Sequence, residues 1–145
     1  DCGFLLLPVR TELETIPLAR DELLAVLPEG HPLADRPSFP VDALCSEPFM
    51  LLEKGGRTEI SEIFARHGLT PDVRFTTLDD YAIMSMVESG LGISVLPQLI
   101  LKRAPYRIVA KPLDTPAYRN IALALRSRKN ASLAVKRFLG YLEYR

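Results

Sequence analysis

The segment from residue 86 to residue 97, MVESGLGISVLP, restricts the possible folds of this chain more than any other. It continues a helical apolar pattern whose inward face is expected to be formed by Ile83, Met86, Val87 and Gly90. Gly90 suits the left-handed conformation that ends a helix. The apolar run 93–96 is typical of a strand covered on both faces, and Pro97 fits the first turn of another helix. Elements joined this tightly predict an α/β fold built around a parallel or mixed sheet.

Similar patterns predict the remaining elements. Apolar runs predict strands over residues 2–7, 15–20, 22–27, 49–52, 72–76, 107–110 and 118–125. Helices are predicted over 58–67, 77–90 and 131–144, with short helical pieces over 40–44 and 99–103. The helix over 58–67 should bury Ile60, Ile63, Phe64 and His67, and the last helix Ala134, Phe138, Tyr141 and Leu142. Thr77 and Asp80 have the spacing of a capping box. The strand over 2–7 is expected to be buried and to have a bare edge that attracts another strand.

Composition restricts the class of protein. Of the 145 residues, 48% are hydrophobic and 25% are charged, which is typical of a globular domain. The chain has 18 basic and 18 acidic residues, so it shows no overall electrostatic footprint for nucleic acid. Cys2 and Cys45 resemble buried thiols and favour a reducing, cytoplasmic compartment. No apolar run approaches the roughly 20 residues of a membrane span. The chain begins at Asp1 without a methionine, which suggests a fragment.

The most suggestive local chemistry is Lys54-Gly55-Gly56-Arg57-Thr58, directly before a predicted helix. Gly55 and Gly56 allow close approach to the backbone, and a helix that begins near Thr58 offers unpaired N–H groups and the positive end of its dipole. Arg57 adds a guanidinium group that matches a carboxylate, and Thr58 adds a hydroxyl. Two interpretations are open: a small anion site, or a surface loop in which Thr58 is only the helix cap.

Other candidate site residues are weaker. Thr76 and Thr77 lie at the carboxyl end of a predicted strand, where open α/β sheets place ligands, although Thr77 also fits a simple cap. His31 fits a turn. With two histidines and two cysteines, none at ligand spacing, we expect no metal site and no cofactor. No acid/base pair or nucleophile motif is present, so we expect no catalytic residues and no enzyme.

A set of short motifs extends along nearly the whole chain. In order, they are Asp1-Cys2-Gly3-Phe4, residues 24–34, Leu44, Glu47-Pro48-Phe49, Phe64, Gly68, Pro71, residues 87–97 and Phe138. This set resembles the effector-binding domain of LysR-type transcriptional regulators. The turn His31-Pro32-Leu33-Ala34 and the Gly-Leu-Gly-Ile strand are its most specific parts. The resemblance implies a fold like that of type II periplasmic binding proteins, with two α/β subdomains, two crossover strands and an effector cleft between the subdomains.

The resemblance also implies a domain organisation. Residues 1–19 would be a remnant of the first subdomain, truncated at its N-terminus, together with the first crossover. Residues 20–118 would form the second subdomain, and 119–145 the return crossover and the C-terminal helix of the first. By family position, Leu7 and Pro8 would line the cleft mouth, although a structural stop is their simpler role. The loop at Gly55, Gly56, Arg57 and Thr58 corresponds to one that contacts effectors.

These features lead to three functional hypotheses. The preferred one is the sensing module of a LysR-type regulator. It would bind a small anionic effector, an organic acid or amino-acid-like molecule, and act as a homodimer or homotetramer. DNA would be bound only through a helix-turn-helix domain absent from this chain, and no membrane would be involved. The alternative is a solute-binding protein of a transporter with the same fold. The third is an enzyme whose catalytic groups come from the missing subdomain.

Overall fold

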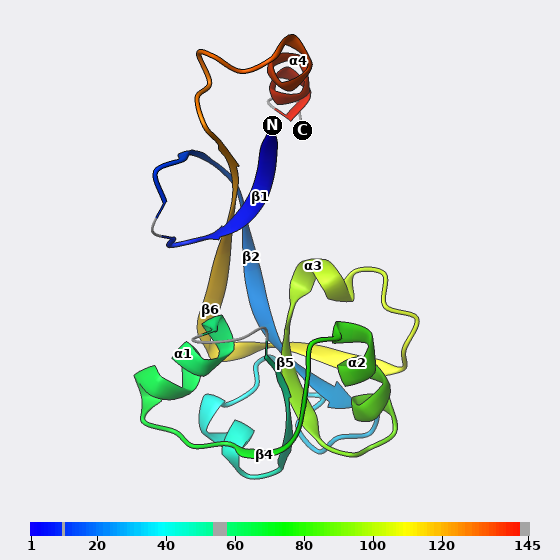
Figure 1. The fold of residues 1–145 in the computed structure, drawn as a ribbon. Helices are drawn as coiled ribbons and strands as arrows, with labels where there is room; N and C mark the ends of the chain where they lie inside the picture. Colours follow the sequence, from blue (N-terminus) through cyan, green and yellow to red (C-terminus); the bar gives the residue numbers. More distant parts are fainter. Residues whose placement is uncertain (10, 54–57, 143–145) are drawn as a thin grey trace. The chain divides into compact units, whose positions relative to one another are not determined.

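The computed structural model describes residues 1–9, 11–53 and 58–142. The chain divides into two compact units, one made of residues 21–118 and the other of residues 1–20 and 119–145. Six strands form a mixed sheet in the order β1-β6-β2-β5-β3-β4 (Figure 1). Two of them, β2 (Glu14–Pro28) and β6 (Ile108–Leu125), contain the points at which the chain passes from one unit to the other.

The centre of the unit 21–118 is the short strand β5 (Ile93–Pro97). It pairs antiparallel with β2 and parallel with β3 (Pro48–Leu52), and all five of its residues are buried. The prediction of a strand covered on both faces is therefore confirmed. Strand β4 (Asp72–Thr77) pairs parallel with β3 and forms one edge of the sheet.

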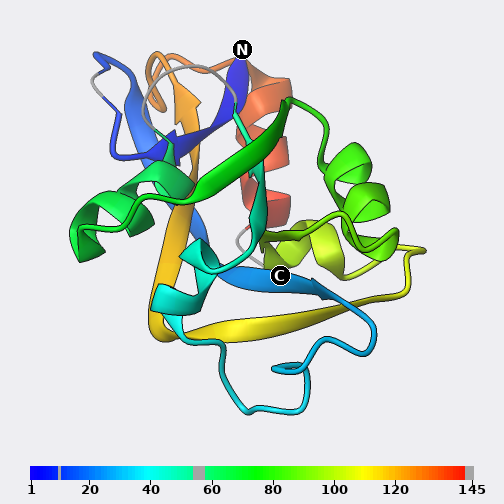
Figure 2. The same cartoon turned by 90° about the horizontal axis from the view of Figure 1, so that it is seen from below.

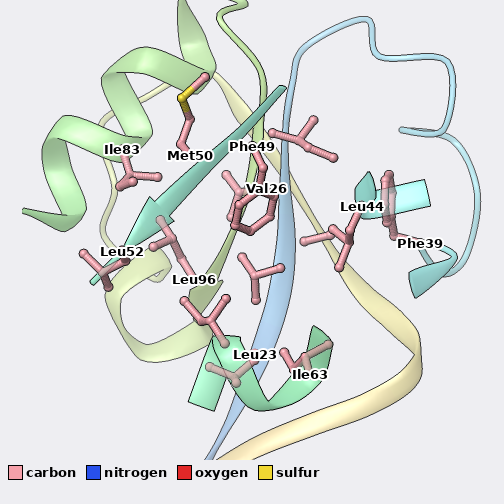
Figure 3. Close-up of a cluster of buried hydrophobic side chains, with 14 of the residues drawn as sticks. Leu23, Val26, Phe39, Leu44, Phe49, Met50, Leu52, Ile63, Ile83 and Leu96 are labelled. Carbon is pink, nitrogen blue, oxygen red and sulfur yellow. The ribbon is translucent and has the colours of Figure 1, made fainter. Parts of the chain in front are cut away.

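Three helices and a helical turn complete this unit, namely α1 (Glu59–His67), α2 (Asp80–Glu88), α3 (Gln98–Leu101) and η1 (Val41–Cys45). Helix α1 buries Ile60, Ile63 and Phe64 as its apolar spacing predicts, whereas His67, also predicted to face inward, is only half-buried. Phe64 meets Phe49 of β3 edge to face, with ring centroids 5.1 Å apart. Side chains from α1, β2, β3 and β5 converge on one core (Figure 3). Burial of each large apolar side chain stabilises such a core by roughly 1.5–3 kcal/mol.

Two glycines shape the joint before β5. Gly90 has a φ of 73° and follows α2 in the left-handed region, as the sequence predicts. Gly92 has a φ of 154°, and a β-carbon at this position would collide with the carbonyl oxygen of Pro48. The backbone of β3 therefore passes too close to residue 92 for any side chain.

The loop between β2 and η1 is fixed to β6 by main-chain bonds. The N–H of Phe39 donates to Pro112 O at 2.8 Å, and the N–H of Asp114 donates to Phe39 O at 2.9 Å. Asp114 Oδ1 also accepts a bond from the N–H of Val41 at 3.0 Å. The loop and the first part of β6 lie side by side in Figure 2. Phe39 is thereby held fully buried in the core.

The second unit is built on an antiparallel pair. Strand β1 (Cys2–Leu7) pairs with β6 from Cys2 opposite Leu125 to Leu7 opposite Asn120. Helix α4 (Leu133–Leu142) packs Leu139 against a small cluster that contains Leu123 and Leu125. In the described part of the chain, no helix has the length and apolar character needed to span a membrane.

Two predicted strand breaks are wrong. Residues 15–20 and 22–27 belong to the single strand β2, because Asp21 is buried and accepts a hydrogen bond instead of forming a turn. The predicted strands over 107–110 and 118–125 are likewise parts of the single strand β6, which begins at Ile108 and continues through two prolines. At the first of them, Pro112, the carbonyl oxygen is paired with the N–H of Phe39.

Three predictions of burial also require correction. Strand β1 is not buried, since Phe4 is 64% exposed and Leu6 is 37% exposed. In α4 the inward face is formed by Val135, Leu139 and Leu142, whereas Ala134, Phe138 and Tyr141 are exposed. In α2 the third buried side chain beside Ile83 and Val87 is Met84, with Met86 only half-buried.

Candidate functional site

The carboxyl ends of three parallel strands define the candidate site. Strands β4 and β5 are each parallel to β3, so all three point toward the same edge of the sheet. Leu52 and Thr77 are opposite each other at the ends of β3 and β4, and the N–H of Glu53 donates to Thr77 O at 3.0 Å. The next helices, α1 after β3, α2 after β4 and α3 after β5, all begin at this edge. Open α/β sheets bind ligands at such edges, where helix N-termini present positive dipole ends.

Thr58 caps α1 in a reciprocal hydroxyl arrangement. Its Oγ1 accepts a bond from the N–H of Ser61 at 3.2 Å, while its own N–H donates to Ser61 Oγ at 2.9 Å. Both capping groups are neutral, so neither cap side chain places a negative charge at this helix start. Glu59 and Glu62 do lie in the first turn, and Glu62 pairs with Arg66 at 3.4 Å. Thr58 is therefore the cap of α1, and a further contact of its hydroxyl with a ligand stays a prediction.

The other residues predicted for this loop are Gly55, Gly56 and Arg57. They lie outside the described residues, so the predicted anion site at these positions stays a prediction.

Thr76 and Thr77 end β4 as predicted, but their local roles differ from the sequence pattern. Thr76 is exposed, and the half-buried Thr77 accepts a bond from the N–H of Asp79 at 3.2 Å. The capping box of Thr77 with Asp80 is wrong, because helix α2 begins two residues too late for it, at Asp80. Asp79 is the cap instead, and its Oδ1 accepts from the N–H of Tyr81 at 2.9 Å. In this turn the Thr77 hydroxyl oxygen acts as an acceptor, and its own hydrogen atom takes no part in the cap of α2.

Leu7 and Pro8 belong to the other unit of the chain. Leu7 ends β1 opposite Asn120 and is half-buried, while Pro8 directly follows the strand and is exposed. Their position at the end of a strand is as predicted. Contact with a ligand stays a prediction for both residues.

Asp21 holds the start of the third helix. Its side chain is almost fully buried, and Oδ1 accepts a bond from the N–H of Leu99 at 3.0 Å. The sequence identifies Asp21 as a turn or cap residue but gives no sign that it caps α3, which lies 78 positions further along the chain. This carboxylate places a negative charge at the third helix start, unlike the hydroxyl cap of α1.

Cys45 is a half-buried thiol near the Asp42 carboxylate. Burial raises the pKa of the Cys45 thiol above its ordinary value of 9.0, a backbone hydrogen bond at Thr70 lowers this pKa by less, and the Asp42 carboxylate makes the smallest contribution and raises it. A thiol with a raised pKa is a poor nucleophile at neutral pH. Among the described residues, no group of three or more His, Cys, Asp or Glu side chains is arranged to hold a metal.

The sequence profile of the LysR substrate binding domain family matches residues 1–145. The chain belongs to this family. The predicted resemblance is thereby confirmed, and so is the fold class, because the structural relatives of this LysR substrate-binding domain have the type II periplasmic-binding-protein-like fold.

The LysR domain is similar to full regulators and to isolated regulatory domains. It is 33% identical over 141 residues to the uncharacterized HTH-type transcriptional regulator YvbU of Bacillus subtilis, covering 96% of this chain and 48% of that protein. The chain thus spans about half the length of the curated relatives it matches. The CcmR regulatory domain of Synechocystis PCC6803, solved with 2-PG, superposes with a TM-score of 0.87 at 29% identity, covering 98% of this chain and 71% of that one.

A second structural relative was also solved with a ligand. The effector-binding domain of QuiR in complex with shikimate gives a TM-score of 0.77 at 27% identity, covering 90% of this chain and 64% of that one. The LysR domain is therefore the effector-binding type of module found in transcriptional regulators. The relatives are regulators and not transporters or enzymes, so the solute-binding alternative is not favoured.

Proposed function

We propose that this LysR domain senses a small anionic metabolite, an organic acid or an amino-acid-like molecule, at the edge where β3, β4 and β5 end. The observation that carries the proposal is the common edge of these parallel strands, from which α1 and α2 begin. Helix starts stabilise anions through their N–H groups and dipoles. The ligands of CcmR and QuiR, 2-PG and shikimate, agree with a small-molecule effector.

The residues proposed to contact the effector are those predicted from the sequence. Thr58 and Thr77 would supply hydroxyl donors, and Thr76 lies beside them on β4. Gly55, Gly56 and Arg57 would supply backbone approach and a guanidinium group to a carboxylate. Leu7 and Pro8 would contribute from the other unit.

The domain assignment is also a proposal. The compact unit 21–118 supports the assignment of residues 20–118 to the second subdomain. The unit of residues 1–20 and 119–145 supports the assignment of 1–19 and 119–145 to crossovers and part of the first subdomain. Effector binding would favour one angle between the subdomains and so shift the population of regulator states that bind DNA. DNA would be bound through a helix-turn-helix domain, in the cytoplasm.

A homodimer or homotetramer is the proposed assembly, with α1 and β4 at the interface. Strand β4 ends the sheet, and its apolar side chains Val73 and Phe75 are 39% and 50% exposed. Exposed apolar residues at a sheet edge are typical of an interaction surface. Light scattering after size exclusion should show a dimer or tetramer, and Phe75→Glu should shift it toward monomer. A monomer at micromolar concentration would contradict this assembly.

A thermal-shift screen with organic acids and amino acids tests the sensing function. A ligand that binds only the folded state raises the melting temperature with concentration. Thr77→Val and Arg57→Ala should each reduce the shift given by an active acid. Arg57→Ala should leave the ligand-free melting temperature nearly unchanged, whereas Thr77→Val should lower it slightly because it removes the acceptor for the N–H of Asp79. Thr115→Val is the matched control, since Thr115 is an exposed threonine on β6 away from the ends of β3 and β4. Equal loss in the control, or no loss at Thr77 and Arg57, would contradict this placement of the site.

A further inference from the structure

The overall charge balance conceals a strong difference between the two units. Residues 21–118 contain nine basic and fourteen acidic residues, whereas residues 1–20 and 119–145 contain nine basic and four acidic residues. The neutral net charge of the whole chain is therefore the sum of an acidic unit and a basic unit. A basic unit within a regulator of transcription has the electrostatic character of a surface that binds polyanions.

Most of the basic excess lies in one continuous stretch, residues 126–137, which we name the basic segment. Five of its twelve residues are basic and none is acidic. The segment links the end of β6 to the first turns of α4, shown in orange in Figure 1. All five cationic residues are exposed, namely Arg126, Arg128, Lys129, Lys136 and Arg137.

Local hydrogen bonds order the basic segment. Ser127 Oγ accepts from the N–H of Asn130 at 3.3 Å, and Ser132 Oγ accepts from the N–H of Val135 at 3.3 Å at the start of α4. The N–H of Arg128 donates to Glu14 Oε2 at 2.9 Å, which ties the segment to β2. The cations are thus displayed from a defined backbone and not from a free tail.

Four of the five cations are available for an external partner. Arg126, Lys129, Lys136 and Arg137 form no ion pair with any residue that the structure describes. Two carboxylates lie beside the segment: Glu14 accepts from the N–H of Arg128, and Asp1 lines a hollow next to Arg126 and Ser127. Exposed cations without partners keep their full charge for a ligand, with little desolvation needed.

The surface of the basic segment is hollowed in two places. One hollow of about 580 Å³ is lined by Asp1, Arg126, Ser127, Asn130, Ala131 and Ser132. A second of about 280 Å³ is lined by Arg128, Lys136, Leu139 and Gly140. Both exceed the size of a phosphate group, and each contains at least one cation. Arginine, lysine, serine and asparagine are the side chains that contact DNA phosphates most often.

We infer that the basic segment binds the phosphate backbone of duplex DNA without reading sequence. The inference rests on the proposed function in one respect, namely that a DNA-binding regulator holds this surface near DNA. Such contacts would add affinity beside the operator and would be screened by salt, because each contact releases a counterion. An acidic protein surface is less well matched, since the segment combines its cations with the hydroxyl and amide donors typical of phosphate binding.

The test measures binding of the 145-residue chain to a labelled random-sequence DNA duplex. Binding is detected by fluorescence anisotropy at several salt concentrations. Four phosphate contacts predict a slope of log K against log salt of about −3.6. The variant R126Q/K129Q/R137Q should bring this slope closer to zero by about 2.7 and weaken binding about tenfold or more at the lowest salt concentration. Arg128 is left in place because its neighbourhood includes Glu14.

The matched control is R36Q/K102Q/R103Q, which removes the same charge from exposed positions in the unit 21–118. It should retain the slope of the unmodified chain. R126K/K129R/R137K keeps the charges and should also bind normally. Circular dichroism should give similar melting temperatures for all variants, since every substituted residue is exposed.

Several results would overturn the inference. They are failure of the unmodified chain to bind the duplex at the lowest salt concentration, equal loss in R36Q/K102Q/R103Q, or salt-dependent self-association without DNA binding. The effector screen contains no DNA, so failure of the sensing function and failure of this surface are observed separately.

Discussion

His31 Nε2 lies 2.7 Å from Glu47 Oε1, and the same imidazole accepts a bond from the N–H of Leu33 at Nδ1, 3.0 Å away. Because a backbone N–H only donates, Nδ1 accepts and the ring hydrogen lies on Nε2. The ring is buried, and its centroid lies 6.0 Å from that of Phe39. A residue that the sequence identifies only as part of a turn thus ties the loop after β2 to the residue before β3.

We expect His31→Ala to lower the free energy of unfolding by about 2 kcal/mol. The substitution leaves the N–H of Leu33 without its acceptor, and a buried unsatisfied donor costs about 1–3 kcal/mol. Urea denaturation measures the change. Glu47→Gln is the control, because its amide oxygen still accepts from Nε2, and we expect it to cost less than about 1 kcal/mol. An unchanged urea midpoint for His31→Ala would show that the loop does not need this contact.

Gly92→Ala is expected to prevent folding of the unit 21–118. A β-carbon there would meet the Pro48 carbonyl group and lie 2.7 Å from Met50 Cε, and the φ of 154° is itself strained for alanine. Gly90→Ala is the matched comparison, since its β-carbon would meet open space and only its positive φ is unfavourable, at a cost of about 1 kcal/mol. Circular dichroism and soluble yield distinguish them. Equal behaviour of the two variants would refute the close approach of β3.

Thr58→Ala should lower stability by about 1 kcal/mol, because it removes the hydroxyl that accepts from Ser61 N–H at the start of α1. Thr58→Ser keeps the hydroxyl and should lie within a few tenths of a kcal/mol of the unmodified chain. Chemical denaturation of the three proteins decides this. A loss in Thr58→Ser as large as that in Thr58→Ala would assign the effect to the methyl group and not to the cap.

Cys45 should react slowly with thiol reagents at pH 8, because burial raises its pKa and keeps it protonated in the folded state. The unfolded thiol ionises at its ordinary, lower pKa, so the stability from this group is complete below that value and decreases as the pH rises through 9.0. Cys45→Ser should remove the part of the decrease in stability at alkaline pH that is due to this thiol. The free energy of unfolding is measured as a function of pH for both proteins. If it decreases equally steeply above pH 9.0 in both, Cys45 has no such role.

The sequence predicts local structure well where neighbouring residues determine it. The run from α2 through Gly90 to β5 is determined by apolar spacing, two glycines and a proline, so its order of elements follows from residues 86–97 alone. Helix α1 is similar, because its cap, its apolar face and Gly68 are consecutive. In both places the information that specifies the element lies inside it.

Errors arise where distant residues decide the outcome. From the sequence, Asp21 resembles a turn residue. Its actual role is to accept a hydrogen bond from the N–H of Leu99, and the two residues are too far apart in the chain for the sequence pattern to indicate this bond. Helix α4 has two apolar stripes, and contact with Leu123 and Leu125 selects the one that contains Leu139. Most of the predicted site likewise cannot be predicted from the sequence pattern alone. At Thr77, for example, the choice between a helix cap and a ligand contact depends on where α2 begins.

The order β2-β5-β3 has a consequence for synthesis of the chain. Strands β2 and β3 are not neighbours in the sheet, and each reaches the other only through β5, which follows both of them in the sequence. A nascent polypeptide that has emerged only as far as Gly92 therefore has two apolar strands with no partner between them. Ribosome-bound intermediates of this length should need a chaperone, whereas the release of five more residues supplies the strand that unites them.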